Sequence, residues 1–211
     1  MATERNNAEF EAGMKVPLVE EFYTLQGEGY HTGHAAYFIR IGGCDVGCSW
    51  CDTKFSWNPE LHPPVEIEAI AERAAEFPAG AVVVTGGEPL MVNMAPLTAA
   101  LKERGISTFL ETSGAYPLTG EWDWICLSPK RNSPPVGDIH QKAHELKVII
   151  TSAEDLDWAV EHSGLVSDDC KLFLQPEWSR RETVLPLIID FAMENPSWAI
   201  SIQSHKYMHI P

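Results

Sequence analysis

Short apolar runs alternate with amphipathic segments along most of the chain. Apolar residues at positions 67, 70, 71, 74 and 77 recur at the spacing of one helix face, which predicts a helix. The run AVVVT that follows is short and β-branched, which is typical of a strand buried on both faces. The same criteria predict strands at 18–25, 35–41, 81–85, 106–111, 122–127, 145–150, 171–175 and 198–203, and helices at 65–77, 94–104, 153–161 and 181–195.

This order of elements indicates an α/β fold. Strands that alternate with helices form a mostly parallel sheet with the helices outside it. The helices are too few for a closed eight-unit barrel, so we predict a partial, open (β/α) barrel with a reduced helix count. Residues 1–15 are polar and aperiodic and are expected to form a flexible tail before one domain at 16–211. Functional residues should then follow the carboxyl ends of the strands.

Composition narrows the class of protein. The 211 residues carry a net charge of −15, which argues against a duplex nucleic-acid binder and against an anionic membrane surface as partner. The sequence has no apolar run of transmembrane length, and its first residues do not form a secretory signal. Its 5 cysteines are odd in number and partly clustered, so we expect reduced thiols and a cytoplasmic location.

Three of the cysteines carry the strongest chemical signal. Cys44, Cys48 and Cys51 have the spacing C-x3-C-x2-C. Three close thiolates can hold three irons of a 4Fe–4S cluster, and the missing fourth cysteine would leave one iron open to a ligand. A structural zinc site is the alternative, but zinc normally takes four ligands, so one of three histidines would have to fold in. These are His31, His34 and His62.

The triad closely resembles that of the radical S-adenosylmethionine superfamily. The resemblance implies that S-adenosylmethionine chelates the open iron and is cleaved by one electron to a 5′-deoxyadenosyl radical. It also implies that Trp50 contacts the adenine, and that Glu88, in the family's Gly86-Gly87-Glu88 motif, accepts a hydrogen bond from the methionine ammonium. Glu111 and Ser128 would contact the ribose and amino acid parts, and Lys130 the carboxylate of the cofactor.

Further segments resemble the 7-carboxy-7-deazaguanine synthase family within that superfamily. They are FYTLQGEG at 22–29, Arg40, CDT at 51–53 and QSHKYMHIP at 203–211, and the resemblance runs from residue 19 to the end. It implies conversion of 6-carboxy-5,6,7,8-tetrahydropterin to 7-carboxy-7-deazaguanine with loss of ammonia, on the way to queuosine and other 7-deazapurines. It also implies a homodimer, with a protein such as flavodoxin as a possible reductant.

The residue types suit a carboxylated pterin. Arg40 offers a planar fork for a carboxylate, and Gln26 and Glu28 offer donors and acceptors for the pterin edge. The resemblance implies that the C-terminus reaches the substrate and that the hydroxyl of Thr53 holds Mg2+ together with the substrate. The expected substrate-binding residues are Gln26, Gly27, Glu28, Arg40, Thr85, Gln175, His205 and Pro211.

Two alternatives remain open from the residues. A radical S-adenosylmethionine activase of a glycyl-radical protein would share the triad and Glu88, but it leaves the TLQGEG segment and Thr53 unexplained. A non-catalytic iron–sulfur or zinc-binding protein would explain the triad alone. The other two cysteines, Cys126 and Cys170, are expected to be buried. Five tryptophans are expected in the core or at an oligomer interface: Trp122, Trp124, Trp158, Trp178 and Trp198.

Overall fold

A single curved sheet organises the protein. The structure is a computed structural model that describes residues 12–211, and its nine-stranded sheet has the order β3-β1-β2-β4-β5-β6-β7-β8-β9. β1 pairs antiparallel with both β2 and β3, and every pair from β2 to β9 is parallel. The predicted α/β fold with a mostly parallel sheet is confirmed. The strands are β1 (Lys15–Leu25), β2 (Ala35–Ile41), β3 (Pro64–Glu66), β4 (Ala81–Gly86), β5 (Ser107–Thr112), β6 (Trp124–Leu127), β7 (Glu145–Ile150), β8 (Lys171–Pro176) and β9 (Trp198–Ile200).

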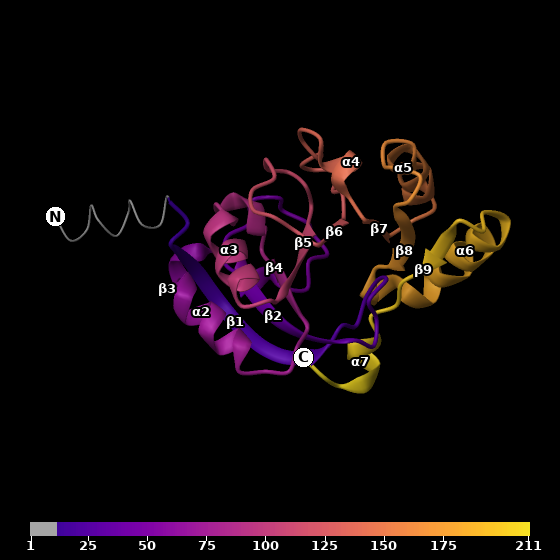
Figure 1. Ribbon diagram of the computed structural model, residues 1–211. Coiled ribbons are helices and arrows are strands. Elements are labelled where there is room, and N and C mark those ends of the chain that lie inside the picture. The colour runs from indigo at the N-terminus through magenta and orange to yellow at the C-terminus, as the bar shows by residue number, and fades with distance from the viewer. Residues whose placement is uncertain (1–11) are drawn as a thin grey trace.

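Four longer helices cover the outer face of the sheet, as Figure 1 shows. They are α2 (Ile67–Ala75), α3 (Ala95–Glu103), α5 (Glu154–Ser163) and α6 (Arg181–Glu194). Side chains alternate along a strand, so Ile39 and Ile41 of β2 join the main core beneath the helices. Phe38, just before them, belongs to a small second cluster, and Arg40, between Ile39 and Ile41, lies on the same inner face as Phe38. The helices therefore bury one face of the sheet and leave the other for the site.

The structure differs from the sequence prediction mainly in the shorter elements. The last strand ends at Ile200 and not at residue 203, and a short helix, α7 (Ser204–Met208), follows it. Another short helix, α4 (Ile139–Lys142), lies between the predicted strands at 122–127 and 145–150, where no helix was predicted. The Ser152 side chain does not cap α5; instead the Asp155 carboxylate accepts hydrogen bonds from the Ser152 and Thr151 amides.

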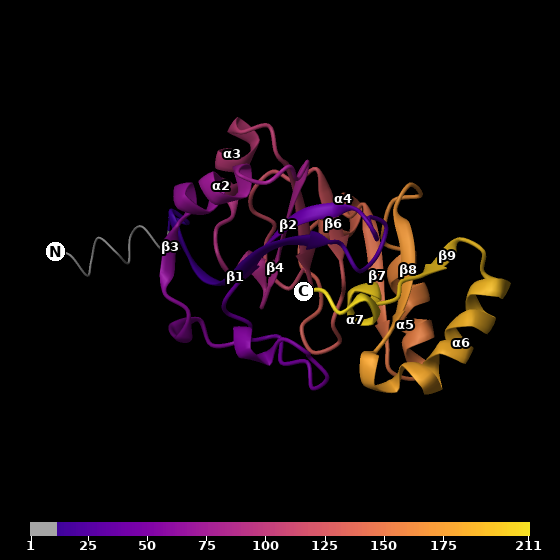
Figure 2. The same ribbon diagram turned by 90° about the horizontal axis from the view of Figure 1, so that it is seen from below.

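The connection between β1 and β2 crosses the open side of the barrel. The Gly29 amide donates to Ser201 Oγ at 2.9 Å, the Tyr30 amide donates to Glu145 Oε2 at 3.2 Å, and the Ser204 amide donates to the Gly27 carbonyl at 2.9 Å. This connection and α7 lie side by side in both Figure 1 and Figure 2. A segment near the N-terminus and the last residues of the chain thus meet over the inner face.

The start of the chain is only partly described. Residues 1–11, most of the predicted tail, lie outside the described part, so the tail remains a prediction. The Met14 carbonyl accepts a hydrogen bond from the Ile67 amide, where β1 begins. Within residues 12–211, no helix combines the length and apolar character needed to cross a membrane.

Candidate active site

Polar side chains converge on the inner face near the carboxyl ends of the strands. Arg40 and Thr85 are register partners on β2 and β4, while Glu111, Lys147 and Gln175 lie on β5, β7 and β8. Two adjoining cavities of about 480 Å³ each open there. A volume of this size accommodates a small ligand. The residues that line both cavities include Glu28, Asp52, Thr53, Gly86, Glu111, Gln203 and Lys206.

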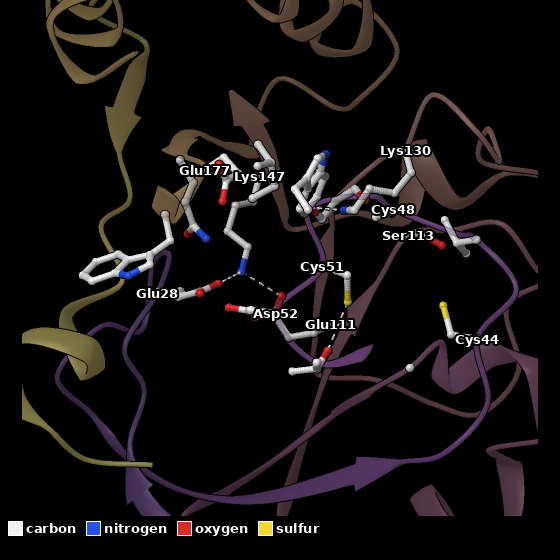
Figure 3. Close-up of a pocket in the computed structure, with 18 of the residues that line it drawn as sticks. Glu28, Cys44, Cys48, Cys51, Asp52, Glu111, Ser113, Lys130, Lys147 and Glu177 are labelled. Carbon is white, nitrogen blue, oxygen red and sulfur yellow. Dashed lines mark hydrogen bonds and ion pairs between the residues drawn. The ribbon is translucent and has the colours of Figure 1, made fainter. Parts of the chain in front are cut away.

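The first cavity contains the cysteine triad. Cys44, Cys48 and Cys51 all line it, are half-buried and are free thiols (Figure 3). All five cysteines lie within the described residues, and none forms a disulfide; Cys126 and Cys170 are buried, as predicted. No histidine is among the described residues that line this cavity, and in residues 12–211 no three potential ligand side chains are close enough to hold one metal ion. Three half-buried thiols that line one cavity are sulfur ligands of the kind that hold a 4Fe–4S cluster.

The glycine pair of the Gly86-Gly87-Glu88 segment brings β4 against the cysteine loop. The Gly87 amide donates to the Ile41 carbonyl, and the Glu88 amide donates to the Gly43 carbonyl, both at 2.8 Å. A Cβ at Gly87 would lie 2.1 Å from the Gly43 carbonyl oxygen, and Gly86 has a φ of 147°. Glycine is required at both positions for the backbone to approach this closely. The segment thereby fixes the start of the cysteine loop.

The Glu88 carboxylate is engaged by the protein itself. Its Oε1 accepts hydrogen bonds from the Leu90 amide at 3.1 Å and from Thr112 Oγ1 at 2.6 Å, and its Oε2 accepts from the Ser113 amide at 2.8 Å and from Ser113 Oγ. These four donors match the capacity of a carboxylate. Glu88 lines the first cavity but is only 1% exposed. Its observed role is to join the ends of β4 and β5, and its predicted contact with the cofactor ammonium stays a prediction.

The remaining predicted cofactor residues also line the first cavity. Lys130 Nζ donates to Ser128 Oγ at 2.7 Å and lies 5.7 Å from the centre of the Trp50 ring. Burial lowers the pKa of Lys130, and the nearby Cys48 opposes that change. Glu111 lines both cavities. The structure thus gathers every residue predicted to bind the cofactor around the three thiols.

The second cavity gathers the residues predicted to bind the substrate. Gln26, Gly27, Glu28, Arg40, Thr85, His205 and Pro211 line it, whereas Gln175 lines the first cavity. Arg40 Nε donates to Glu20 Oε1 at 2.7 Å, and within residues 12–211 its two terminal nitrogens have no protein acceptor. The His205 ring covers Gly27 so closely that a Cβ there would lie 2.2 Å from His205 Nδ1. The two terminal nitrogens of the Arg40 guanidinium can therefore donate hydrogen bonds to an anionic ligand.

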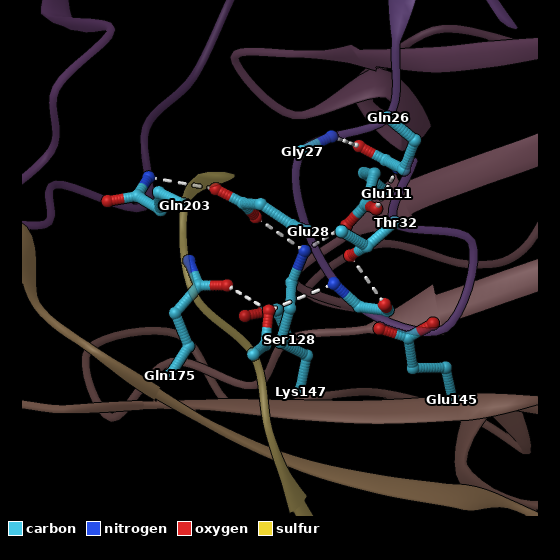
Figure 4. A network of polar contacts seen from close by, with 12 residues as sticks. Gln26, Gly27, Glu28, Thr32, Glu111, Ser128, Glu145, Lys147, Gln175 and Gln203 are labelled. Atoms are coloured by element: carbon cyan, nitrogen blue, oxygen red, sulfur yellow. Dashed lines mark hydrogen bonds and ion pairs between the residues drawn. The ribbon is translucent and has the colours of Figure 1, made fainter. Parts of the chain in front are cut away.

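A chain of hydrogen bonds joins several of the residues that line the two cavities (Figure 4). Lys147 Nζ donates to Glu28 Oε2 at 2.7 Å and to Glu111 Oε2 at 2.9 Å. At the ends of the chain, Gln203 Nε2 donates to Glu28 Oε1 at 2.8 Å and Gln26 Nε2 donates to Glu111 Oε1 at 3.4 Å. Burial by itself raises the pKa of Glu28, but the charge and hydrogen bond of Lys147, with the hydrogen bond from Gln203, lower that pKa to about 2. Glu28 is therefore ionised at neutral pH.

Thr53 lies where the cavities join. Its Oγ1 is 3.4 Å from Cys51 Sγ, and its side chain lines both cavities. The adjacent Asp52 accepts a hydrogen bond from Lys206 Nζ at 2.7 Å, which ties the cysteine loop to α7. The hydroxyl thus stands next to the thiols on one side and the predicted substrate residues on the other.

Several residues at the site were missed from the sequence. Lys147, Gln203 and Lys206 hold the network together, and Trp178 lines the first cavity although it was predicted in the core or at an interface. Lys206 Nζ lies 4.9 Å from the centre of the Trp178 ring. Gln203 and Lys206 belong to the QSHKYMHIP segment that carried the family resemblance. Lys147 had a signal of another kind, because a lysine in the middle of a strand buried on both faces needs a partner.

Comparisons with known proteins agree with this geometry. A family description, "Radical SAM superfamily", matches residues 38–127. The open barrel with three thiols beside a glycine-rich strand end thus defines a radical S-adenosylmethionine enzyme. The chain is 54% identical to 7-carboxy-7-deazaguanine synthase of Flavobacterium psychrophilum over the whole of both chains. It is 45% identical to the enzyme of that name from Synechocystis sp., covering 92% of this chain and 93% of the relative.

A solved structure supports the same assignment. The crystal structure of QueE from Escherichia coli superposes with a TM-score of 0.80 at 32% identity, covering 94% of this chain and 98% of that one. The chain belongs to the 7-carboxy-7-deazaguanine synthase family, whose members are carbon–nitrogen lyases of the radical S-adenosylmethionine superfamily. This membership sets aside the activase and the non-catalytic metal-binding protein.

Proposed function

We propose that this protein converts 6-carboxy-5,6,7,8-tetrahydropterin to 7-carboxy-7-deazaguanine and ammonia. The observation that carries the proposal is the pair of adjoining cavities, one lined by three thiols and the other by Arg40, Gln26 and His205. Family membership supplies the product name. A small carboxylated heterocycle fits the second cavity, because a free guanidinium fork and an amide meet there.

The first cavity has the ligands for the cofactors. Cys44, Cys48 and Cys51 would hold a 4Fe–4S cluster, which, with S-adenosylmethionine bound, supplies one-electron radical chemistry. The chain's own contribution is positional: Gly86 and Gly87 allow the close approach of the cysteine loop, and Lys130 and Ser128 line the same cavity. Free thiols are consistent with a reducing compartment such as the cytoplasm.

The second cavity would orient the substrate. The terminal nitrogens of Arg40 can bind the pterin carboxylate while its Nε stays fixed by Glu20. Glu28, ionised and held on both oxygens, can accept hydrogen bonds from the N–H groups of the pterin edge. His205 covers the cavity from α7, and Pro211 brings the end of the chain to the same place.

Thr53 is the proposed Mg2+ ligand. Its hydroxyl lies at the junction of the two cavities, and Mg2+ commonly combines few protein oxygens with substrate oxygens and waters. We expect Thr53→Ala to lower the turnover rate about tenfold or more and to weaken its Mg2+ dependence, while the absorption spectrum of the cluster is unchanged. The matched control is Thr183→Ala, on the exposed part of α6. A Thr53→Ala enzyme with the wild-type rate and Mg2+ dependence would contradict the role.

The reaction itself is tested directly. The reconstituted enzyme is incubated under anaerobic conditions with the carboxytetrahydropterin, S-adenosylmethionine, a reductant and Mg2+. The mass of the product is then measured by mass spectrometry. Loss of one ammonia from the substrate, absent with a Cys51→Ala variant, is the expected result. An enzyme that cleaves S-adenosylmethionine but leaves the pterin unchanged would refute the proposed substrate.

The assembly and the electron donor are also proposals. We infer a homodimer, supported by apolar side chains that remain exposed on α6: Leu187 and Ile189 are each 41% exposed and Met193 is 80% exposed. Light scattering at micromolar concentration should give twice the mass of one chain, and a monomer would refute it. A protein of the flavodoxin type is the proposed reductant, and it is tested by its ability to replace dithionite in the assay.

A further inference from the structure

The buried ammonium of Lys147, which lines the first cavity, joins Glu28, a predicted substrate residue, to Glu111, a predicted cofactor residue. Lys147 is only 3% exposed, and its Nζ contacts Glu28 Oε2 at 2.7 Å and Glu111 Oε2 at 2.9 Å (Figures 3 and 4). We propose that Lys147 is a positioning residue of the reaction, which fixes the orientation of the Glu28 and Glu111 carboxylates for their ligands. The inference deepens the proposed function and rests on it.

The contacts of the two carboxylates leave little freedom. Each carboxylate gives one oxygen to Lys147 and the other to an amide, from Gln203 for Glu28 and from Gln26 for Glu111. Hydrogen bonds on both oxygens fix the plane of a carboxyl group as well as its place. The chain Gln203–Glu28–Lys147–Glu111–Gln26 thereby connects α7, the β1–β2 connection, β7 and β5. A shift of Lys147 would move groups in both cavities together.

Charge explains why a lysine is needed at this position. The side chains of Glu28 and Glu111 are 20% and 21% exposed, and without an adjacent cation two carboxylates so close together would repel each other. Other titratable groups face the network: His31 in the β1–β2 connection, Cys126 on β6, Lys130 after β6, Glu145 on β7 and His205 on α7. Burial raises the pKa of Cys126 and Glu145 and lowers that of His31, Lys130 and His205, so it shifts each of these groups toward its neutral form. Lys147 is then the balancing charge for Glu28 and Glu111.

The inference is tested first by binding, without the cluster or the cofactor. Anaerobic calorimetry measures the Kd of the carboxytetrahydropterin for the wild type, Lys147→Met and Lys147→Arg. We expect Lys147→Met to weaken binding at least tenfold, because Glu28 loses its fixed orientation and its ionised form. The loss should shrink as the pH rises from about 6 to about 9, because Glu28 without its cation titrates above its ordinary pKa. Lys147→Arg keeps the charge and should recover most of the affinity.

Kinetics of the reconstituted enzyme give the second readout. Lys147→Met should lower kcat/KM about 100-fold, because Glu28 and Glu111 both lose their fixed orientation. In this variant kcat should fall and KM should rise. Lys147→Arg should recover at least tenfold of that loss. The matched control is Lys171→Met, which removes an exposed lysine from the neighbouring strand β8 and should leave Kd and kcat/KM unchanged.

Each outcome decides the question. A folded Lys147→Met with Kd and kcat/KM within threefold of wild type, or a Lys147→Arg no better than Lys147→Met, overturns the inference. If Lys147→Met does not fold, the double variant Lys147→Met/Glu111→Gln is used instead, because it keeps the net charge of the site. Its kcat/KM is compared with that of Glu111→Gln. A kcat/KM that is a further tenfold lower supports the role of Lys147, and equal values of kcat/KM overturn it. A wild type that neither binds nor converts the pterin refutes the proposed substrate instead, so the two failures are distinct.

Discussion

Replacing the Glu88 carboxylate with an amide should destabilise the protein strongly. In Glu88→Gln the side chain keeps its size but loses one oxygen and its charge. Whichever way the amide turns, its NH2 group faces a backbone N–H, that of Ser113 or that of Leu90. A buried donor left without an acceptor costs about 1–3 kcal/mol, and the lost charge-assisted hydrogen bonds add to this. We therefore expect the free energy of unfolding to fall by about 3 kcal/mol.

This loss is large against a total stability of about 5–15 kcal/mol for a domain. Urea denaturation of the cluster-free protein at pH 7, followed by circular dichroism, measures the shift of the midpoint. The control is Glu72→Gln on α2, an exposed carboxylate whose loss should change the stability by about 0.5 kcal/mol or less. A loss below about 1 kcal/mol in Glu88→Gln would refute the structural role and would leave cofactor binding as the reason for this residue.

Two more substitutions test other parts of the structure. Gly87→Ala would place a Cβ 2.1 Å from the Gly43 carbonyl oxygen, so the cysteine loop must move. The iron content of this variant after reconstitution should fall at least about twofold. The control Gly80→Ala, which has open space around its Cβ, should bind as much iron as the wild type. Burial and the neighbouring His140 lower the pKa of His162 to about 4. His162 therefore takes up its proton at a lower pH in the folded state than in the unfolded state, so the free energy of unfolding decreases as the pH falls from 6.5 through 4. In a series of urea midpoints measured over this pH range, His162→Gln should reduce the dependence on pH. An unchanged series would contradict the assignment to His162.

Local pattern was enough to predict the outer helices and every strand of the sheet except β3 (Pro64–Glu66), whose last two residues were assigned to the following helix. The helix predicted at 65–77 is α2 (Ile67–Ala75), because Ile67, Ile70 and Ala74 form a continuous buried face. The same reasoning failed at the end of the chain, where a strand was extended to residue 203. There α7 is held by distant partners: the Ser204 amide donates to Gly27, and Lys206 Nζ donates to Asp52. Contacts between the two ends of the chain leave no periodic signal in either segment.

In the site, too, features set by local sequence could be predicted, whereas features set by distant contacts could not. Motif residues such as the cysteines and Gly86-Gly87-Glu88 could be named from the sequence, because their chemistry or backbone geometry needs those residue types. The role of Glu88 could not be named fully, because the three residues that donate to it are Leu90, Thr112 and Ser113, and two of these follow it by more than twenty positions. A motif therefore identifies a residue without showing whether it contacts the ligand or supports the residues that do.

Lys147 shows which further signal a sequence of this kind contains. In β7 the residues Leu146, Val148 and Ile150 alternate into the outer core, which leaves Lys147 on the inner face. A buried charge must be paired, so a lysine at an inner position of one strand requires carboxylates from other inner positions. Glu111 on β5 meets that requirement from the sheet itself, and Glu28 meets it from the connection that crosses the open side. In an open barrel, the charges that alternation assigns to the inner face must therefore balance one another, and the groups that achieve this balance are the ones that join the substrate and cofactor sides.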